Sequence, residues 1–185
     1  MSTEREQIYY ELLVLRCRRH DEGAMEELIH HWEKRLLYYV RRLVSDEEDA
    51  WDVLQETWLK VFAQIGMLRQ PRSLPMWLYR IARNTAMSRL RGRYADRAVL
   101  DEEELAEDIP DQADSFTFED VEQVHYGLSK LSLPHREVLT LYFLEDLSIE
   151  EIAEVLEVAS GTIKSRLHFA KRALRTIIEQ EECGQ

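Results

Sequence analysis

A basic, aromatic segment in the first half of the chain carries residue types that bind nucleic acid. Residues 69–93 contain seven arginines and no acidic residue. Guanidinium groups pair with phosphates and aromatic rings stack on unpaired bases, so we expect this segment to bind DNA that is single-stranded or opening. Aromatic residues at helical spacing also pack protein cores, and for Trp77 the sequence leaves both interpretations open. The candidate residues are Arg69, Arg72, Trp77, Tyr79, Arg80, Arg83, Asn84 and Arg91.

A second basic segment lies near the C-terminus. Residues 158–178 contain five lysines and arginines and no acid, whereas residues 148–157 carry four glutamates. A short helix, a three-residue turn and a longer basic helix are typical of a helix-turn-helix, whose second helix enters the major groove of DNA. The alternative is a structural helix with a solvated basic face. The candidate DNA-binding residues are Ser160, Thr162, Lys164, Ser165, Arg166, His168, Lys171 and Arg172.

An acidic ridge is the third candidate surface. Its members recur at helical spacing and suit a basic protein surface, although ordinary solvation would also explain them. The helix that carries them is expected to bury a stripe of Trp51, Leu54 and Trp58. The ridge consists of Asp49, Asp52, Gln55 and Glu56.

Catalytic and metal-binding patterns are missing from the sequence. There is no glycine-rich phosphate loop, no nucleophile motif and no H-E-x-x-H, so we predict neither enzymatic activity nor a cofactor. Cys17 and His20 lack a second spaced pair, and the adjacent His30 and His31 point to different helix faces, which argues against a metal site. Two distant cysteines, no secretory signal pattern and no bilayer-length apolar run predict a cytoplasmic protein without membrane insertion.

Composition predicts an all-α protein with two small helical domains. The chain has 185 residues, with 6 Gly and 4 Pro, 45% hydrophobic and 32% charged residues, which favours helices over a turn-rich β fold. The net charge is −12, but residues 94–123 hold twelve acids and one arginine and account for −11 of it. We therefore predict a first domain over 1–93, an acidic flexible linker over 94–123 and a second domain over 124–185. Local patches, rather than the global charge, decide the partners.

Helical periodicity and capping motifs define the expected elements. In the first domain we expect a helix near residues 8–20, one over 25–43, one opened by a Ser45/Glu48 capping box and ended at Gly66, and one beginning at Pro75. In the second domain we expect helices over 124–131, 134–145, 148–157 and 160–179, the third opened by a Ser148/Glu151 capping box.

Several motifs resemble those of the extracytoplasmic-function (ECF) sigma factors, small bacterial RNA polymerase sigma factors that retain only regions two and four. Residues 49–57 (DAWDVLQET) are similar to the family's D-A-E-D-L-V-Q-E-T, and residues 77–84 match its W-L-Y-R-I-A-R-N. Residues 133–138 (LPHREV), 151–153 (EIA) and 161–167 (GTIKSRL) resemble region four. The motifs follow the family's order along most of the chain, which makes the resemblance specific.

The resemblance implies a function and a set of partners. The ridge would dock on the clamp helices of the polymerase β′ subunit, and the loop over 66–75 with the Trp77 helix would recognise and open the −10 element, capturing a flipped base. Region four would read the −35 element and meet the β flap. Partners would be core RNA polymerase, duplex and melted promoter DNA, and an anti-sigma factor as a further candidate. The rival interpretation is an autonomous helix-turn-helix regulator with a helical sensor domain.

Three residues depart from the family pattern. Trp51 stands where the family often has Glu, so the ridge either loses a charge or gains an aromatic contact. Glu157 occupies a turn position usually held by Gly, which adopts a positive φ at no steric cost. Phe169 stands where Arg is common, which forfeits a DNA contact unless its ring packs inward or against a thymine methyl.

Overall fold

The computed structural model of the chain describes residues 4–44, 46–93 and 121–182. Every element within these ranges is a helix, which confirms the all-α prediction. The chain divides into two compact units, Met1–Leu100 and Asp101–Gln185. Most of the predicted acidic linker, residues 94–120, lies outside the described residues.

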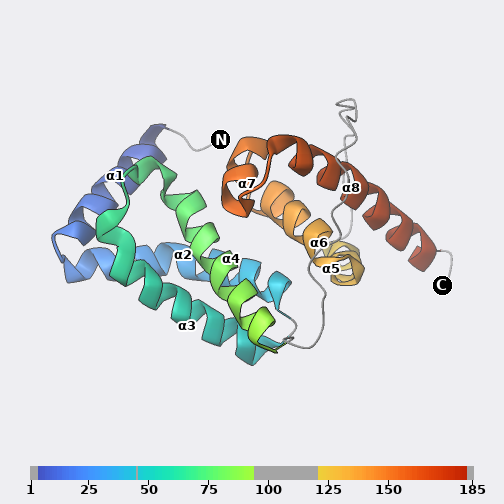
Figure 1. Cartoon of the computed structure of the whole chain (residues 1–185), viewed down its shortest axis with the longest axis horizontal. Coiled ribbons are helices and arrows are strands. Elements are labelled where there is room, and N and C mark those ends of the chain that lie inside the picture. Colours follow the sequence, from blue (N-terminus) through green and yellow to red (C-terminus); the bar gives the residue numbers. More distant parts are fainter. Residues whose placement is uncertain (1–3, 45, 94–120, 183–185) are drawn as a thin grey trace. The chain divides into compact units, whose positions relative to one another are not determined.

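Unit 1 is built from four α-helices joined by short connections (Figure 1). Helices α3 and α4 pack against each other and against α2, while α1 packs on α2 and on the two 3₁₀ turns that lead from α3 to α4. The elements are α1 (Glu4–Arg18), α2 (Glu22–Leu43), α3 (Glu47–Gln64), η1 (Ile65–Met67), η2 (Pro71–Ser73) and α4 (Leu74–Arg93).

Aspartates cap the N-termini of α2 and α3. The Asp21 side chain accepts a hydrogen bond from the Ala24 N–H at 3.2 Å, and Asp46 accepts one from the Asp49 N–H at 3.3 Å. The predicted cap at position 45 is therefore wrong by one residue, because Asp46 has the extended backbone and the carboxylate that a cap requires. Helix α3 ends at Gln64, and Gly66 lies inside η1.

The core of unit 1 is rich in aromatic rings. Tyr79 is fully buried and makes edge contacts with Trp32 and Tyr39, at centroid distances of 5.9 and 5.3 Å. These contacts tie α4 to α2. The inner face predicted for α4 is confirmed as buried and consists of Leu78, Ile81, Ala82 and Thr85.

Unit 2 contains the predicted helix-turn-helix. Its elements are α5 (Val121–Lys130), α6 (Leu133–Leu139), a π-helical segment η3 (Thr140–Leu144), α7 (Ile149–Leu156) and α8 (Ser160–Glu182). Helix α5 begins at Val121, so three residues assigned to the linker are helical. The capping box of α7 is confirmed, because Ser148 accepts from the Glu151 N–H while the Glu151 carboxylate accepts from the Ser148 N–H. Helix α8 packs against α5, α6 and α7.

Neither a membrane-spanning helix nor a metal cluster occurs among the described residues. None of the described helices combines the length and apolar character needed to cross a bilayer. In the same ranges, no three His, Cys, Asp or Glu side chains gather closely enough to hold a metal ion. Cys17 is a buried free thiol, and burial raises its pKa, which disfavours the thiolate that a metal would bind.

Candidate nucleic-acid interface

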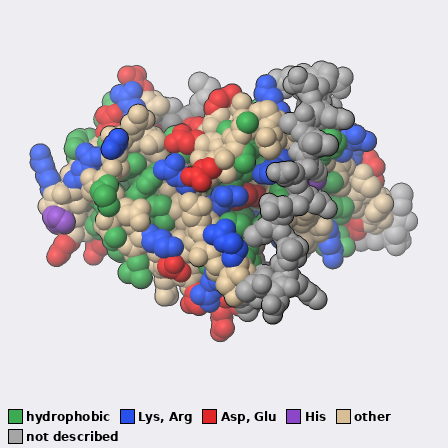
Figure 2. Space-filling model, viewed as in Figure 1, with side chains coloured by type: hydrophobic (Ala, Val, Ile, Leu, Met, Phe, Trp, Pro, Cys, Tyr) green, Lys and Arg blue, Asp and Glu red, His purple; other side chains and the backbone are tan. Residues whose placement is uncertain are grey.

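Helix α4 presents a polar face opposite its buried side. Asn84 and Arg91 are exposed, Arg80 and Arg83 are half-buried, and the helix carries no acidic residue. Figure 2 shows Lys and Arg side chains on the face that α4 crosses. An acid-free row of guanidinium groups with an amide among them can bind phosphates and base edges.

The aromatic residues predicted beside this face belong to the core. Tyr79 lies three and seven residues before Ala82 and Ala86, which are also fully buried, so helical periodicity turns its ring inward. Trp77 exposes only 9% of its surface. Both rings therefore pack in the core of unit 1 in the unbound chain, and DNA contact by Trp77 or Tyr79 stays a prediction.

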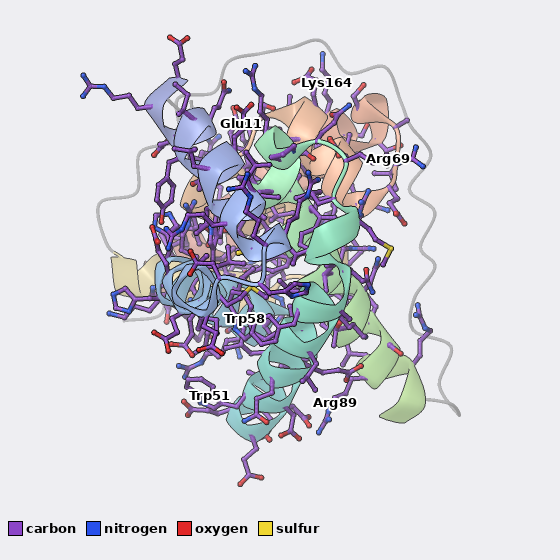
Figure 3. All side chains as sticks on the ribbon, turned by 90° about the vertical axis from the view of Figure 1, so that its left-hand side faces the viewer. Glu11, Trp51, Trp58, Arg69, Arg89 and Lys164 are labelled. Carbon is purple, nitrogen blue, oxygen red and sulfur yellow. The ribbon has the colours of Figure 1, made fainter. Side chains whose placement is uncertain are left out.

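The loop between α3 and α4 holds two further candidates. Arg69 and Arg72 are exposed, and Nε of Arg72 donates to Oε1 of Glu11 on α1 at 2.5 Å. Arg18, also on α1, donates through Nη2 to the carbonyl of Leu68. Figure 3 labels Glu11 on α1 and Arg69 on this loop. Sequence reasoning missed Glu11 and Arg18 because about 50 or 60 residues separate each from its partner, and no local pattern signals such a contact.

The predicted acidic ridge is partly occupied by internal ion pairs. Asp49 is buried and accepts from Arg89 on α4, and the same guanidinium reaches Oδ2 of Asp52 at 2.6 Å. Glu56 pairs with Lys60 at 2.8 Å. A buried carboxylate needs such an internal partner, so Asp49 serves the packing of α3 on α4, and docking through Asp49 stays a prediction. Asp52, Gln55 and Glu56 stay exposed.

The exposed side of α3 is more apolar than predicted. Trp51 is 42% exposed and Leu59 is 68% exposed, and Phe62 is also exposed. The prediction of a buried Trp51 is wrong, because the buried stripe follows Ala50, Val53, Leu54, Thr57, Trp58 and Val61. The four-residue spacing of Trp51, Gln55 and Leu59 is the signal that could have revealed this surface stripe.

In unit 2, α8 presents its basic residues unevenly. Ser160, Lys164 and Arg172 are exposed, whereas Thr162, Arg166, His168 and Lys171 are half-buried. Ser165 is buried on the packed side of the helix, and a DNA contact by Ser165 stays a prediction. The Lys171 ammonium lies over the rings of Tyr142 and Phe143, at 5.5 and 5.4 Å from their centroids. These cation–π contacts anchor it to η3.

Glu157 and Phe169, the two residues of unit 2 that depart from the family pattern, are both placed by the structure. Glu157 adopts a left-handed conformation, with φ 58° and ψ 41°, so the turn keeps the conformation that a glycine would favour. Phe169 is half-buried, and its ring meets His168 edge-on at 5.5 Å.

Comparisons with known proteins bear on both units. Residues 28–95 match the family described as sigma-70 region 2, and residues 122–174 match sigma-70, region 4. The RNA polymerase sigma-H factor of Pseudomonas aeruginosa is 33% identical over 175 residues, covering 88% of this chain and 90% of that protein. The ECF RNA polymerase sigma-E factor of Haemophilus influenzae is 30% identical over 187 residues, covering 94% and 97%.

Solved structures share the fold. The sigma factor RpoE of Bartonella quintana, solved in complex with the anti-sigma factor NepR, is 25% identical with a TM-score of 0.65, covering 83% of this chain and 96% of that one. CnrH, solved with the cytosolic domain of CnrY, is 20% identical with a TM-score of 0.67, covering 91% and 96%. The second likeness concerns the fold alone.

Proposed function

This chain belongs to the ECF sigma factors of the sigma-70 family, and from that membership we propose how its surfaces divide the work of transcription initiation. As a sigma factor, it binds core RNA polymerase and directs it to promoter DNA. It acts as a binding subunit while the core polymerase performs the chemistry of RNA synthesis. Because core RNA polymerase works in the bacterial cytoplasm, we expect this chain to act there.

The polar face of α4 and the loop over 66–75 contact the −10 element. The observation that carries this assignment is the acid-free row of Arg80, Arg83, Asn84 and Arg91, which faces away from the buried side of α4. Arg69 and Arg72 extend the cationic surface onto the loop. Because Trp77 and Tyr79 are buried, phosphate and base-edge contacts by polar side chains support the assignment better than ring stacking does.

The exposed side of α3 contacts core polymerase. Gln55, Glu56 and Asp52 supply polar groups, and Trp51 and Leu59 supply apolar area between and beside them. An apolar centre with a charged surround is the usual composition of a protein–protein interface. At the position where the family often has Glu, Trp51 therefore offers core polymerase an aromatic contact in place of a charge.

Unit 2 contacts the −35 element through the first turns of α8 and meets the β flap through the preceding helices. Exposed Ser160 and Lys164 lie at the N-terminal end of α8, where helix-turn-helix proteins reach base edges. The half-buried Thr162 and Arg166 flank that face. An anti-sigma factor is a further candidate partner, supported by the likeness to the sigma factor solved with NepR.

The rival function, an autonomous helix-turn-helix regulator, would use unit 2 alone. It is not favoured, because it leaves the region 2 match over residues 28–95 unexplained. Run-off transcription separates the two: a sigma factor added to core polymerase yields specific transcripts from a linear promoter template. A regulator would instead bind the promoter without core and alter transcription only when another sigma factor is present.

A further inference from the structure

Helix α1 supports the loop between α3 and α4 from outside the matched regions. It spans Glu4–Arg18, whereas the region 2 match begins at residue 28. It packs against α2 and against both 3₁₀ turns of the loop. The element that contacts the proposed −10 loop is therefore one that the family match does not describe.

An apolar stripe fixes α1 to the body of unit 1. Tyr10, Leu13, Val14 and Cys17 are all buried, and their spacing of three and four residues puts them on one helix face. Side chains on the buried face of a helix lock its position and rotation, because packed interiors tolerate little movement. The polar groups of α1 are thereby held at defined places.

Hydrogen bonds add a second link between α1 and α2. The Tyr9 hydroxyl donates to Oε1 of Glu27 at 2.9 Å, and Nη1 of Arg16 donates to Oε2 of the same carboxylate at 2.6 Å. Nε of Arg16 also donates to Asp21 at 3.0 Å. Both donors lower the pKa of Glu27, Tyr9 most strongly, so this carboxylate is charged at neutral pH.

Two polar contacts then run from α1 to the loop. Arg18 donates to the backbone carbonyl of Leu68, directly before Arg69. Glu11 accepts from Nε of Arg72, whose side chain remains 67% exposed. The first contact holds the loop backbone and the second orients the Arg72 guanidinium, while most of the Arg72 side chain stays exposed to a ligand.

We propose that Glu11 and Arg18 are positioning residues for −10 recognition, holding the loop and the Arg72 guanidinium in the arrangement that meets promoter DNA. The proposal rests on the function assigned above to the loop. An exposed ion pair contributes little to stability, so the role of Glu11 lies in orientation. Pre-ordering the loop removes an entropic cost that DNA binding would otherwise incur.

The test uses holoenzyme reconstituted from the full chain and core polymerase, on a promoter selected from a random duplex library. Variants are Glu11→Gln and Arg18→Met, with Glu26→Gln and Arg19→Met as exposed, charge-matched controls. Promoter opening is followed by permanganate reactivity, and base preference is measured at each −10 position. We expect promoter opening to fall about twofold to tenfold in each test variant, because each loses one hydrogen bond. The affinity for core polymerase should be unchanged.

A double-mutant cycle with Arg72→Gln isolates the Glu11 role. If Glu11 acts through Arg72, then Glu11→Gln has no further effect when Arg72→Gln is present. Base preference at −10 should also change, which a loss of stability alone would not produce. Arg18→Lys, which keeps the charge, replaces Arg18→Met if the latter unfolds.

Two results would overturn the positioning role: wild-type opening and base preference in both test variants, or additive effects of Glu11→Gln and Arg72→Gln. Failure of the function assigned to the loop would look different, because Arg72→Gln alone would then leave opening and base preference at −10 unchanged.

Discussion

The guanidinium of Arg89 makes two hydrogen bonds to Oδ1 of Asp49, at 3.1 Å from Nε and 2.9 Å from Nη2. Arg89 lies on α4 and Asp49 on α3, so the pair joins the helix with the proposed DNA face to the helix with the proposed polymerase face. Figure 3 labels Trp51 near the N-terminal end of α3 and Arg89 towards the C-terminal end of α4. The Asp49 side chain is only 11% exposed, which shields the pair from water.

Removing the guanidinium should destabilise unit 1. Arg89→Met leaves the Asp49 carboxylate without this donor in a largely buried site, and we expect the free energy of unfolding to fall by about 1–3 kcal/mol. Chemical denaturation of the purified chain measures the change. Asp52→Asn should cost less than about 1 kcal/mol, because Asp52 is exposed. Arg91→Met, at an exposed site on the same helix, is the control. An unchanged stability of Arg89→Met would show that the pair is not structural.

Arg80→Ala and Asn84→Ala should impair promoter opening and leave core binding intact. Their side chains lie on the polar face of α4, apart from the exposed side of α3. The loss of a charged hydrogen bond is worth roughly 1.5–3 kcal/mol, so opening should fall about tenfold or more for Arg80→Ala. Permanganate reactivity of the promoter and fluorescence titration with core polymerase provide the two measurements. Lost core binding in folded Arg80→Ala would refute the division of faces.

Core polymerase should bind variants of the exposed α3 side more weakly. Glu56→Arg introduces a like charge against a basic surface, which costs several kcal/mol in a complementary interface. Leu59→Ala and Trp51→Ala should each weaken assembly by about 1 kcal/mol or more, because they remove apolar area from the contact. Leu12→Ala is the control, at a leucine on α1 that is 56% exposed. Wild-type affinity in all three α3 variants would remove this side from the polymerase interface.

The sequence predicted the elements of both units because periodicity and capping are local. The Ser148/Glu151 box and the inner face of α4 from Leu78 to Thr85 follow from spacing alone, and the structure confirms both. The first turn of α3 was misplaced by one residue because Ser45 and Asp46 are both good caps, and the choice depends on backbone conformation.

The site was harder to predict because tertiary contacts reassign polar and aromatic side chains. Helical spacing placed Asp49 on the surface ridge, but in the structure Asp49 pairs with Arg89, which lies 40 residues later in the chain. Tyr79 lay beside an arginine face in sequence, but its ring completes an aromatic cluster with Trp32 and Tyr39. The Asp49–Arg89 pair leaves no local pattern, whereas the spacing of Tyr79 with Ala82 and Ala86 could have placed its ring in the core.

Lys164 and Ser165 should respond differently to substitution although they are neighbours on α8. Lys164 is exposed, and Lys164→Ala should weaken use of a −35 element by roughly 1–3 kcal/mol if it reads a base, in footprinting of the holoenzyme. Ser165 is buried, so Ser165→Lys should unfold unit 2 through an uncompensated buried charge. A folded Ser165→Lys protein with stronger DNA binding would contradict the placement of Ser165.

Acid should loosen α1 from α2 through Glu27. The hydrogen bond from Tyr9, followed by that from Arg16, lowers the pKa of Glu27 below its ordinary value of 4.5. A carboxyl group with a lowered folded-state pKa adds stability above its unfolded pKa, and this stability is lost as the pH falls through the folded-state pKa.

Wild type should therefore melt at a higher temperature than Glu27→Gln by a constant margin from about pH 7 to about pH 5, and the margin should shrink below that. Thermal unfolding followed by circular dichroism across this range measures the margin, and comparison with the variant removes the acid response that the two proteins share. A margin that stays constant into strong acid would show that the charge of Glu27 does not hold α1 in place.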